Sequence, residues 1–320
     1  MTLHIFNPEN DMALADGHPG YTPPAQIQQM RHELWWLPRW WAADGDVVWN
    51  GSDRLALPDD ARIVPWGWSP ALCQQLREAG VQASLLPSAE ALEQLRQLSH
   101  RRTSVQLLGE LREQLPLEGH LADTGAVLCH TMEETEAAVA QQGDALLKSP
   151  WSSSGRGLMP SSDGHWQAWA RHILRSQGSL MVERLLHKVA DFALEFWLDG
   201  KGGVQYRGLS LFYTNGKGAY QGNWVAPEGQ KLQWLMQYVP AQCLIEIRRW
   251  WEQRLARYDY CGPVGIDMML AQEGVCPCIE VNWRMTMGLV SCLAAEQGRF
   301  GRMVVEYVYG HYSAEIEAFG

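Results

Sequence analysis

Three oxygen-bearing side chains near the end of the chain have the types and spacing of a divalent-cation site. Asp267 lies in the apolar run 265–270, and Glu280 and Asn282 lie in the apolar run 278–282. A charge inside an apolar strand is costly unless it has a partner, and residues two apart share one face of a strand. A hairpin would place the three side chains together, and oxygen ligands suit Mg²⁺. The alternative is ordinary alternation on a half-exposed hairpin.

A lysine followed by a Ser/Gly-rich stretch suggests a phosphate site earlier in the chain. Lys148 ends the apolar run 145–148, and residues 149–157 read SPWSSSGRG. Small residues let backbone N–H groups approach phosphate oxygens, and the lysine adds a point charge. This pattern is weak by itself, because any strand can end in lysine and any loop can contain serine and glycine.

A third pattern, residues 181–186 followed by Asp191, could bind a nucleoside. An apolar strand that enters a linker offers backbone hydrogen-bonding groups to an adenine edge. A downstream carboxylate accepts hydrogen bonds from ribose hydroxyls. This pattern is also weak by itself.

Polar side chains follow the first predicted strand, at positions 7 and 9–11. Open α/β sheets bind ligands at the carboxyl ends of their strands, so these residues could contact a second substrate. A turn closed by side chains explains them equally well. We expect the tryptophans of residues 35–68 mainly in the core, with the lining of this pocket as the alternative. The candidate contacts are Asn7, Glu9, Asn10 and Asp11.

In their order and spacing, these patterns resemble the ATP-grasp superfamily over roughly residues 126–288. The order is a lysine with a Ser/Gly loop, then V-E-x-x-L, a carboxylate and D-x₁₂-E-x-N. Its most specific part is EVNWRMTMG, residues 280–288. The resemblance implies an α/β (α+β) fold, with two ATP-grasp lobes preceded by a small parallel α/β domain. The expected domains are 1–103 (N-terminal), 104–182 (lid lobe) and 183–320 (C-terminal lobe with the metal site).

The resemblance also implies a nucleotide site. Lys148 would contact the α- and β-phosphates of ATP. Glu183 and the backbone near Leu185 would hold adenine, and Asp191 would hold the ribose. A loop would close over the phosphates, and its members would be Ser152, Ser153, Ser154, Gly155 and Gly157.

The same resemblance implies that Asp267, Glu280 and Asn282 bind one or two Mg²⁺ ions and that Arg284 faces the transferring phosphoryl group. One departure concerns the dipeptide-ligase branch, which has an arginine two residues before the aspartate. Gly265 stands there in this chain, so Arg284 or Arg156 would supply that charge.

The function implied is ATP-dependent ligation, in which a small-molecule carboxylate becomes an acyl phosphate that an amine or another nucleophile attacks. The alternatives are a kinase of the same superfamily acting on a hydroxyl, and a non-catalytic nucleotide-binding module. Two segments, 152–157 and 215–222, are expected to be mobile and to exclude water. Lys217 and Asn223 are candidate substrate contacts in or beside the second segment.

The elements that would carry these residues alternate between strand and helix. Short strands are expected at 4–6, 46–49 and 62–65, and Ser69-Pro70 should begin a helix because serine is a good N-cap and proline fits the first turn. The basic cluster 100–102 is expected to be a solvated helix end. From Leu289 the pattern predicts helix to the end of the chain.

Composition narrows the class of protein. The chain has 320 residues, 46% of them hydrophobic, and a formal net charge of -10. An acidic chain makes broad nucleic-acid binding unfavourable. No signal peptide or 18-residue apolar stretch is apparent, and seven cysteines without a regular framework suggest reduced thiols. We therefore expect a cytoplasmic enzyme, with a homodimer left open.

Overall fold

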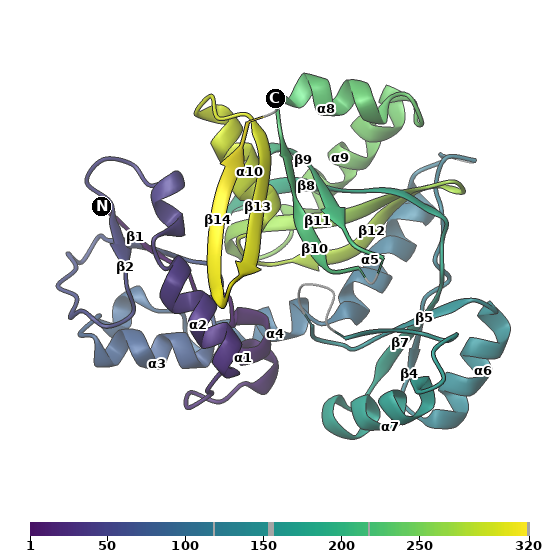
Figure 1. Ribbon diagram of the computed structural model, residues 1–320, viewed down its shortest axis with the longest axis horizontal. Coiled ribbons are helices and arrows are strands. Elements are labelled where there is room, and N and C mark those ends of the chain that lie inside the picture. Colours follow the sequence, from purple (N-terminus) through teal and green to yellow (C-terminus); the bar gives the residue numbers. More distant parts are fainter. Residues whose placement is uncertain (118, 153–156, 217, 319–320) are drawn as a thin grey trace.

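The computed structural model describes residues 1–117, 119–152, 157–216 and 218–318. The strands described there form three sheets with the orders β2-β1-β3, β4-β7-β5-β6 and β12-β11-β8-β9-β10-β13-β14. Figure 1 shows the first sheet on one side of the large sheet and the β4–β7 sheet on the other. This arrangement confirms the expected α/β fold, with a small parallel sheet before two lobes built on antiparallel sheets.

The N-terminal sheet is wholly parallel, since β1 pairs with both β2 and β3 in that sense. Parallel strands end at the same edge, so the turn after β1 and the segment after β3 lie together. Ser69 caps the helix that follows, as predicted, because its side chain accepts the N–H of Leu72 at 3.2 Å. The elements of this domain are β1 (Thr2–Ile5), α1 (Asn10–Asp16), α2 (Ala25–Leu34), η1 (Leu37–Trp40), β2 (Val47–Trp49), β3 (Arg62–Pro65), α3 (Pro70–Glu78), η2 (Ala83–Leu85) and α4 (Ala89–Leu98).

Helix α5 (Arg101–Gln114) packs beneath the large sheet, against β12. Ser104 on this helix accepts the backbone N–H of Val281 at 3.0 Å. The expectation of a solvated helix end at residues 100–102 is wrong, because His100 and Arg101 are 5% and 7% exposed. Arg101 contacts Ser152 and Glu280, and the ring of His100 packs against that of Trp151. Sequence pattern does not reveal these contacts.

The lid lobe is an antiparallel sheet covered by two helices. Its strands β5 and β7 carry Lys148 and Glu183, and its own apolar cluster includes Leu147 and Val182. The elements are β4 (Val127–Cys129), α6 (Met132–Gln142), β5 (Ala145–Lys148), β6 (Leu158–Pro160), α7 (Trp166–Gln177) and β7 (Leu180–Arg184).

The large antiparallel sheet carries the predicted metal ligands on its strands β11 and β12. Its apolar core includes the fully buried Trp251 and Trp283. A second cluster joins Trp66 of the N-terminal domain to α10 and β13, as expected of tryptophans used in packing. The elements are β8 (Lys188–Asp199), β9 (Val204–Thr214), β10 (Tyr220–Val225), α8 (Glu228–Leu235), α9 (Ala241–Leu255), β11 (Cys261–Ala271), β12 (Gly274–Asn282), α10 (Met287–Glu296), β13 (Gly301–Val308) and β14 (His311–Glu317).

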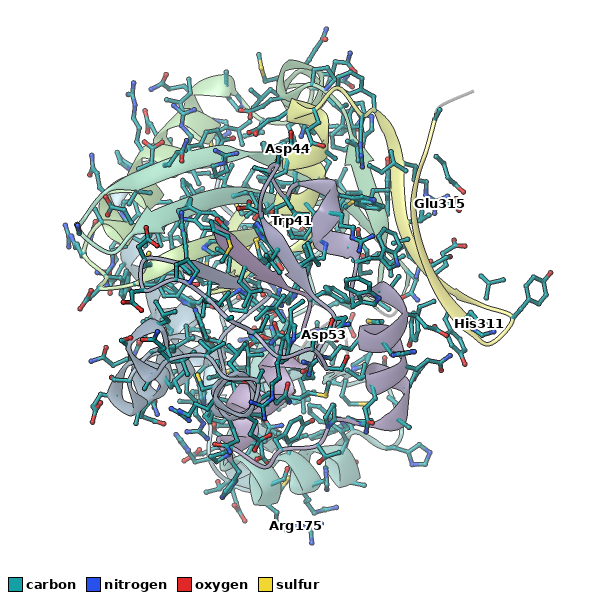
Figure 2. The ribbon with its side chains drawn as sticks, turned by 90° about the vertical axis from the view of Figure 1, so that its left-hand side faces the viewer. Trp41, Asp44, Asp53, Arg175, His311 and Glu315 are labelled. Atoms are coloured by element: carbon teal, nitrogen blue, oxygen red, sulfur yellow. The ribbon has the colours of Figure 1, made fainter. Side chains whose placement is uncertain are left out.

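The prediction of helix from Leu289 to the end is wrong beyond α10. Strands β13 and β14 instead form a hairpin whose tip, Tyr309-Gly310, has positive φ angles of 51° and 84°. Figure 2 shows this hairpin standing at one side of the molecule, with His311 near its tip. The glycine-rich segment 215–222 likewise runs into a strand, since β10 pairs with β9 and β13.

The boundaries 1–103, 104–182 and 183–320 stay a prediction. Among the described residues, no helix combines the length and the apolar character needed to cross a bilayer.

Candidate active site

The two strands that carry the predicted metal ligands form the expected hairpin. Asp267 of β11 lies directly opposite Glu280 of β12, and Gly265 lies opposite Asn282. Directly opposed residues share one face of a sheet, so the three oxygen-bearing side chains converge on one face. Their role as metal ligands stays a prediction.

The electrostatics of this face are those of a site with surplus negative charge. Burial raises the pKa of Asp267 well above its usual range, and the carboxylates of Glu280 and Glu195 raise it further, while Arg284 and a hydrogen bond from Asn282 act in the opposite direction. Two neighbouring carboxylates repel each other, so ionising both costs free energy unless a cation lies beside them. The site would therefore gain from a bound positive charge.

The donor set fits magnesium better than a softer metal. Two carboxylates and one amide are oxygen donors, which Mg²⁺ prefers, and Mg²⁺ commonly completes its shell with water and phosphate. Throughout the described ranges, no group of three or more His, Cys, Asp or Glu side chains could hold a metal ion. A cation here would thus depend on Asn282 and on a ligand for its remaining contacts.

Arg101, the first residue of α5, connects the sheet face that carries the predicted metal ligands to the predicted phosphate loop. Its Nη2 donates to Ser152 Oγ at 3.0 Å and lies 3.1 Å from Glu280 Oε2. Its backbone N–H donates to the carbonyl of Pro150 at 3.1 Å. Sequence reasoning missed this residue, because nothing in the cluster HRR separates the buried arginine from Arg102, which is exposed.

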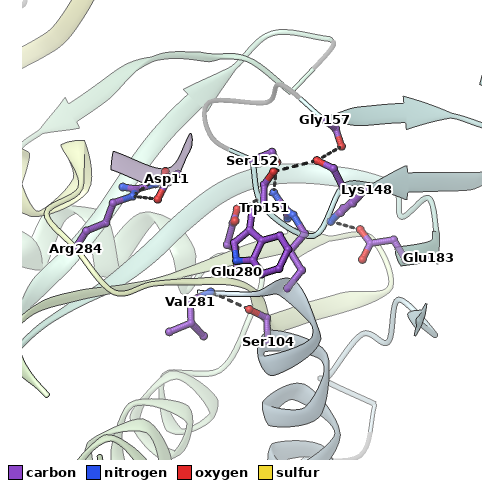
Figure 3. A network of polar contacts seen from close by, with 12 residues as sticks. Asp11, Ser104, Lys148, Trp151, Ser152, Gly157, Glu183, Glu280, Val281 and Arg284 are labelled. Carbon is purple, nitrogen blue, oxygen red and sulfur yellow. Dashed lines mark hydrogen bonds and ion pairs between the residues drawn. The ribbon is translucent and has the colours of Figure 1, made fainter. Parts of the chain in front are cut away.

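A buried ion pair occupies the lid lobe. Lys148 and Glu183 are 5% and 8% exposed, and the ammonium of the first contacts the carboxylate of the second. Figure 3 shows this pair beside Ser152 and Gly157 and facing the side of the large sheet that carries Glu280. The lysine and the glutamate predicted to hold phosphate and adenine thus form an ion pair with each other.

The described ends of the predicted phosphate loop are held close together. The N–H of Ser149 donates to the carbonyl of Gly157 at 2.9 Å. Gly157 has a positive φ of 84°, and a Cβ atom there would lie 2.7 Å from the Cβ of Ser152, so this position requires glycine. The remaining predicted members, Ser153, Ser154 and Gly155, lie outside the described residues, as does the candidate catalytic residue Arg156.

Hydrogen bonds constrain the predicted nucleoside contacts. The N–H of Leu185 already donates to the carbonyl of Asp144 at 2.8 Å, and its side chain is 50% exposed. Asp191 accepts from Lys188 at 2.8 Å and from Thr214 at 2.6 Å. A carboxylate with two donors in place can still accept from a hydroxyl, since it has about four lone-pair positions.

Arg284 connects the sheet that carries the predicted metal ligands to the N-terminal domain. Its Nε lies 2.9 Å from Asp11 Oδ1 and 3.0 Å from Asp11 Oδ2, and both side chains are mostly buried. Figure 3 shows this pair on the opposite side of Glu280 from Lys148. Asp11 is therefore the residue of the turn after β1 that reaches the candidate site.

The other predicted substrate contacts have structural partners. Asn7 donates to the carbonyl of Gly67 at 2.8 Å, and Glu9 pairs with Arg31 at 2.6 Å. Asn10 packs so closely on Gly67 that a Cβ at that position would collide with its amide. These contacts are those expected of a closed turn, and the substrate role of the three residues stays a prediction.

Two further predicted substrate contacts are Asn223, which lies within β10, and Lys217, which precedes that strand in the sequence. Asn223 is fully buried in the large sheet, where its side chain accepts from the hydroxyl of Tyr220 and donates to the carbonyl of Leu211 at 3.4 Å. Lys217 lies outside the described residues.

Comparison with known proteins identifies the fold. No protein-family model matches the chain, and no curated protein matches it significantly. Among solved structures, it is similar to N5-carboxyaminoimidazole ribonucleotide synthetase from Thermus thermophilus, with a TM-score of 0.51, 16% identity, and coverage of 95% of this chain and 83% of that chain. The enzyme of the same type from Staphylococcus aureus, complexed with ADP, has a TM-score of 0.50 at 10% identity, covering 89% and 70%.

Rhizobium etli pyruvate carboxylase is similar over a shorter part, with a TM-score of 0.51, 15% identity, and coverage of 72% of this chain and 20% of that chain. These neighbours are ATP-grasp proteins. The fold implied by the sequence resemblance is therefore confirmed.

Proposed function

We propose that this chain, which has the ATP-grasp fold, is an ATP- and Mg²⁺-dependent ligase that activates a small-molecule carboxylate for attack by an amine. One observation carries the proposal. Arg101 contacts both Ser152 of the predicted phosphate loop and Glu280 of the carboxylate pair, so the residues proposed to bind phosphate and those proposed to bind metal lie next to one another. The Staphylococcus aureus neighbour is complexed with ADP, which supports a nucleotide as the ligand.

In the proposed reaction the substrate carboxylate attacks the γ-phosphorus of ATP, which gives an acyl phosphate and ADP. The amine then attacks the acyl carbon, loses a proton and displaces inorganic phosphate. The protein contributes position and charge rather than covalent chemistry. Lys148 and Arg101 hold phosphate oxygens, and Arg284 faces the transferring group from the side of the N-terminal domain.

Magnesium would be held by Asp267, Glu280 and Asn282, and when bound it neutralises charge on the phosphates. The buried Asp267 carboxyl, whose pKa is raised by burial and by its neighbours, fits such a cation. The amide of Asn282 hydrogen-bonds the same carboxyl and so fixes its orientation.

A trapping experiment tests the proposal. The protein is incubated with Mg-ATP, pooled carboxylic acids and hydroxylamine, which intercepts acyl phosphates. We expect acid-dependent release of ADP together with a hydroxamate. A phosphorylated alcohol in place of hydroxamate would indicate the kinase, and binding of ADP without any release of ADP from ATP would indicate a nucleotide-binding module.

Arg101 supplies a prediction about nucleotide affinity. Arg101→Met removes one charge-assisted hydrogen bond to phosphate, which contributes about 1.5–3 kcal/mol, so the Kd for Mg-ADP should rise roughly tenfold or more. Isothermal titration calorimetry measures this. The matched control is Arg102→Met, one residue along the same helix and exposed, which should leave the Kd within about twofold. An equal Kd for both variants would exclude Arg101 from the nucleotide site.

The proposal includes a cytoplasmic location and leaves the homodimer to be tested by solution mass measurement.

All seven cysteines are free thiols, and only Cys261 is exposed. Cys276 and Cys278 are both buried in the packing between the large sheet and α5, as expected of ordinary core residues.

A further inference from the structure

A buried carboxyl group without a part in the proposed chemistry lies beside the predicted metal ligands. Glu195 of β8 is 1% exposed. It lies directly opposite Gly265 of β11, which lies opposite Asn282 of β12. Opposed residues share a face, so the Glu195 side chain projects from the same face as Asp267 and Asn282.

Missing side chains make room for this carboxyl group. Gly265 of β11 lies directly opposite Glu195. A Cβ on Gly265 would lie 2.8 Å from Glu195 Oε2, and a Cβ on Gly288 would collide with Glu195 Oε1. The surroundings therefore fit a glutamate closely, and a side chain at position 265 would displace it.

Two hydroxyl groups and two cations surround the Glu195 carboxyl. Thr286 donates to Oε2 at 2.8 Å and Ser210 donates to Oε1 at 3.0 Å. Burial raises the pKa of Glu195 to about 7, while the two hydroxyls and the charges of Arg284 and Lys231 act in the opposite direction.

Thr286 connects Glu195 to the start of α10. Its Oγ1 also accepts the N–H of Leu289 at 2.9 Å, which makes Thr286 the N-cap of that helix. Arg284 lies two residues before Thr286, in the short turn between β12 and α10. Whatever fixes Thr286 therefore limits where the Arg284 guanidinium can lie.

Other contacts also hold this turn. Arg284 pairs with Asp11, and the Trp283 ring packs against Tyr258 and Tyr260. The carbonyl of Trp283 accepts from Tyr260 at 3.1 Å, and the N–H of Met285 donates to the carbonyl of Trp66 at 2.8 Å. The bond from Glu195 to Thr286 is a side-chain contact that ties the turn to the sheet carrying the metal ligands.

From these contacts we infer that Glu195 is a positioning residue, which fixes the Arg284 guanidinium at the reacting phosphoryl group by anchoring Thr286 to the large sheet. The inference rests on the proposed function, because only that function gives Arg284 a reacting group to face. If Glu195 served only in packing, its removal would lower the stability of the fold whether or not Arg284 is present. Positioning instead requires that the effect of Glu195 pass through Arg284.

The test compares Glu195→Ala with Glu195→Gln. Misplacing a group by about 1 Å can cost roughly a hundredfold in rate, so Glu195→Ala should lower kcat about 10- to 100-fold while the Kd for Mg-ADP stays within about twofold. Glu195→Gln should keep kcat within about threefold, because the amide can still accept from one hydroxyl and donate to the other. The matched control is Glu228→Ala, which removes a carboxylate bonded to Tyr206 and should keep kcat.

A double-variant cycle separates positioning from packing. In an Arg284→Met background, Glu195→Ala should lower kcat no further, because the group that it positions is already gone. An equal additional loss in that background would overturn the inference. Should Glu195→Ala not fold, Thr286→Val keeps the side-chain shape, removes the hydroxyl and should give the same pattern.

Hydrogen exchange gives a readout that needs no turnover. Glu195→Ala should speed amide exchange in the peptide 284–292, and Glu195→Gln should not. Unchanged exchange together with unchanged kcat would overturn the inference. Wild-type protein that releases no ADP with any acid would overturn the proposed function instead, and the exchange result would still decide whether Glu195 holds this turn.

Discussion

Glu280→Gln is expected to abolish turnover while the fold persists. The change removes one of the two carboxylates that face a bound metal, and a metal contributes several kcal/mol of charge stabilisation, so kcat should fall roughly a thousandfold. The fold should persist because the glutamine oxygen can still accept from Arg101, which now pairs with Glu280 at 3.1 Å. Coupled assay of ADP release measures kcat, and thermal unfolding measures stability.

The control for this variant is Glu306→Gln. Glu306 is exposed on β13, so the same chemical change is made far from the site. It should retain wild-type kcat. Wild-type turnover in Glu280→Gln would remove the metal assignment, because the hairpin pairing of Asp267 and Glu280 would then have only a structural purpose.

Lys148→Met should lower both stability and nucleotide binding. The substitution leaves Glu183 buried without its ion-pair partner, and breaking a buried pair from one side typically costs about 3–5 kcal/mol. The loss of the ammonium also removes a phosphate contact, so Mg-ADP binding should fall below detection at micromolar concentrations. Urea unfolding and calorimetry measure the two effects separately.

A double variant distinguishes these causes. Lys148→Met/Glu183→Leu replaces both charges with apolar groups of similar size, which is often neutral or stabilising. It should recover most of the lost free energy of unfolding and none of the nucleotide affinity. Recovery of affinity along with stability would show that Lys148 acts only through the fold.

Much of the fold was predictable because local pattern and packing agree. The strand at Ala145–Lys148, the capped helix after Ser69 and the hairpin pairing Asp267 with Glu280 all follow from period and turn residues. The carboxylate pair was also readable, since a charge within an apolar strand calls for a partner.

The rest depends on contacts between segments distant in the sequence. From the sequence, Arg101 is predicted to be solvated, because its burial depends on the packing of α5 against β12. The two elements are far apart in the sequence: Ser104 and Val281, which are hydrogen-bonded, are separated by 177 positions. Glu195 likewise gives no local signal, because its space is made by Gly265 on the neighbouring strand β11 and by Gly288 on α10. The hairpin β13–β14 was not predicted. A helix and a strand that each have one exposed face differ only in the period of their apolar residues, and this region was assigned the helical period.

Three ion pairs, Arg101–Glu280, Lys148–Glu183 and Arg284–Asp11, already compensate the charges of the candidate site. Under the proposed function, ligand entry would therefore exchange these partners. A metal–nucleotide complex would bring an anion for each cation and a cation for Glu280, whereas nucleotide without metal would draw Arg101 to phosphate and leave Glu280 uncompensated. Affinity would then be the difference between two sets of pairs rather than the sum of the new contacts, which would favour the chelated nucleotide over its separate components.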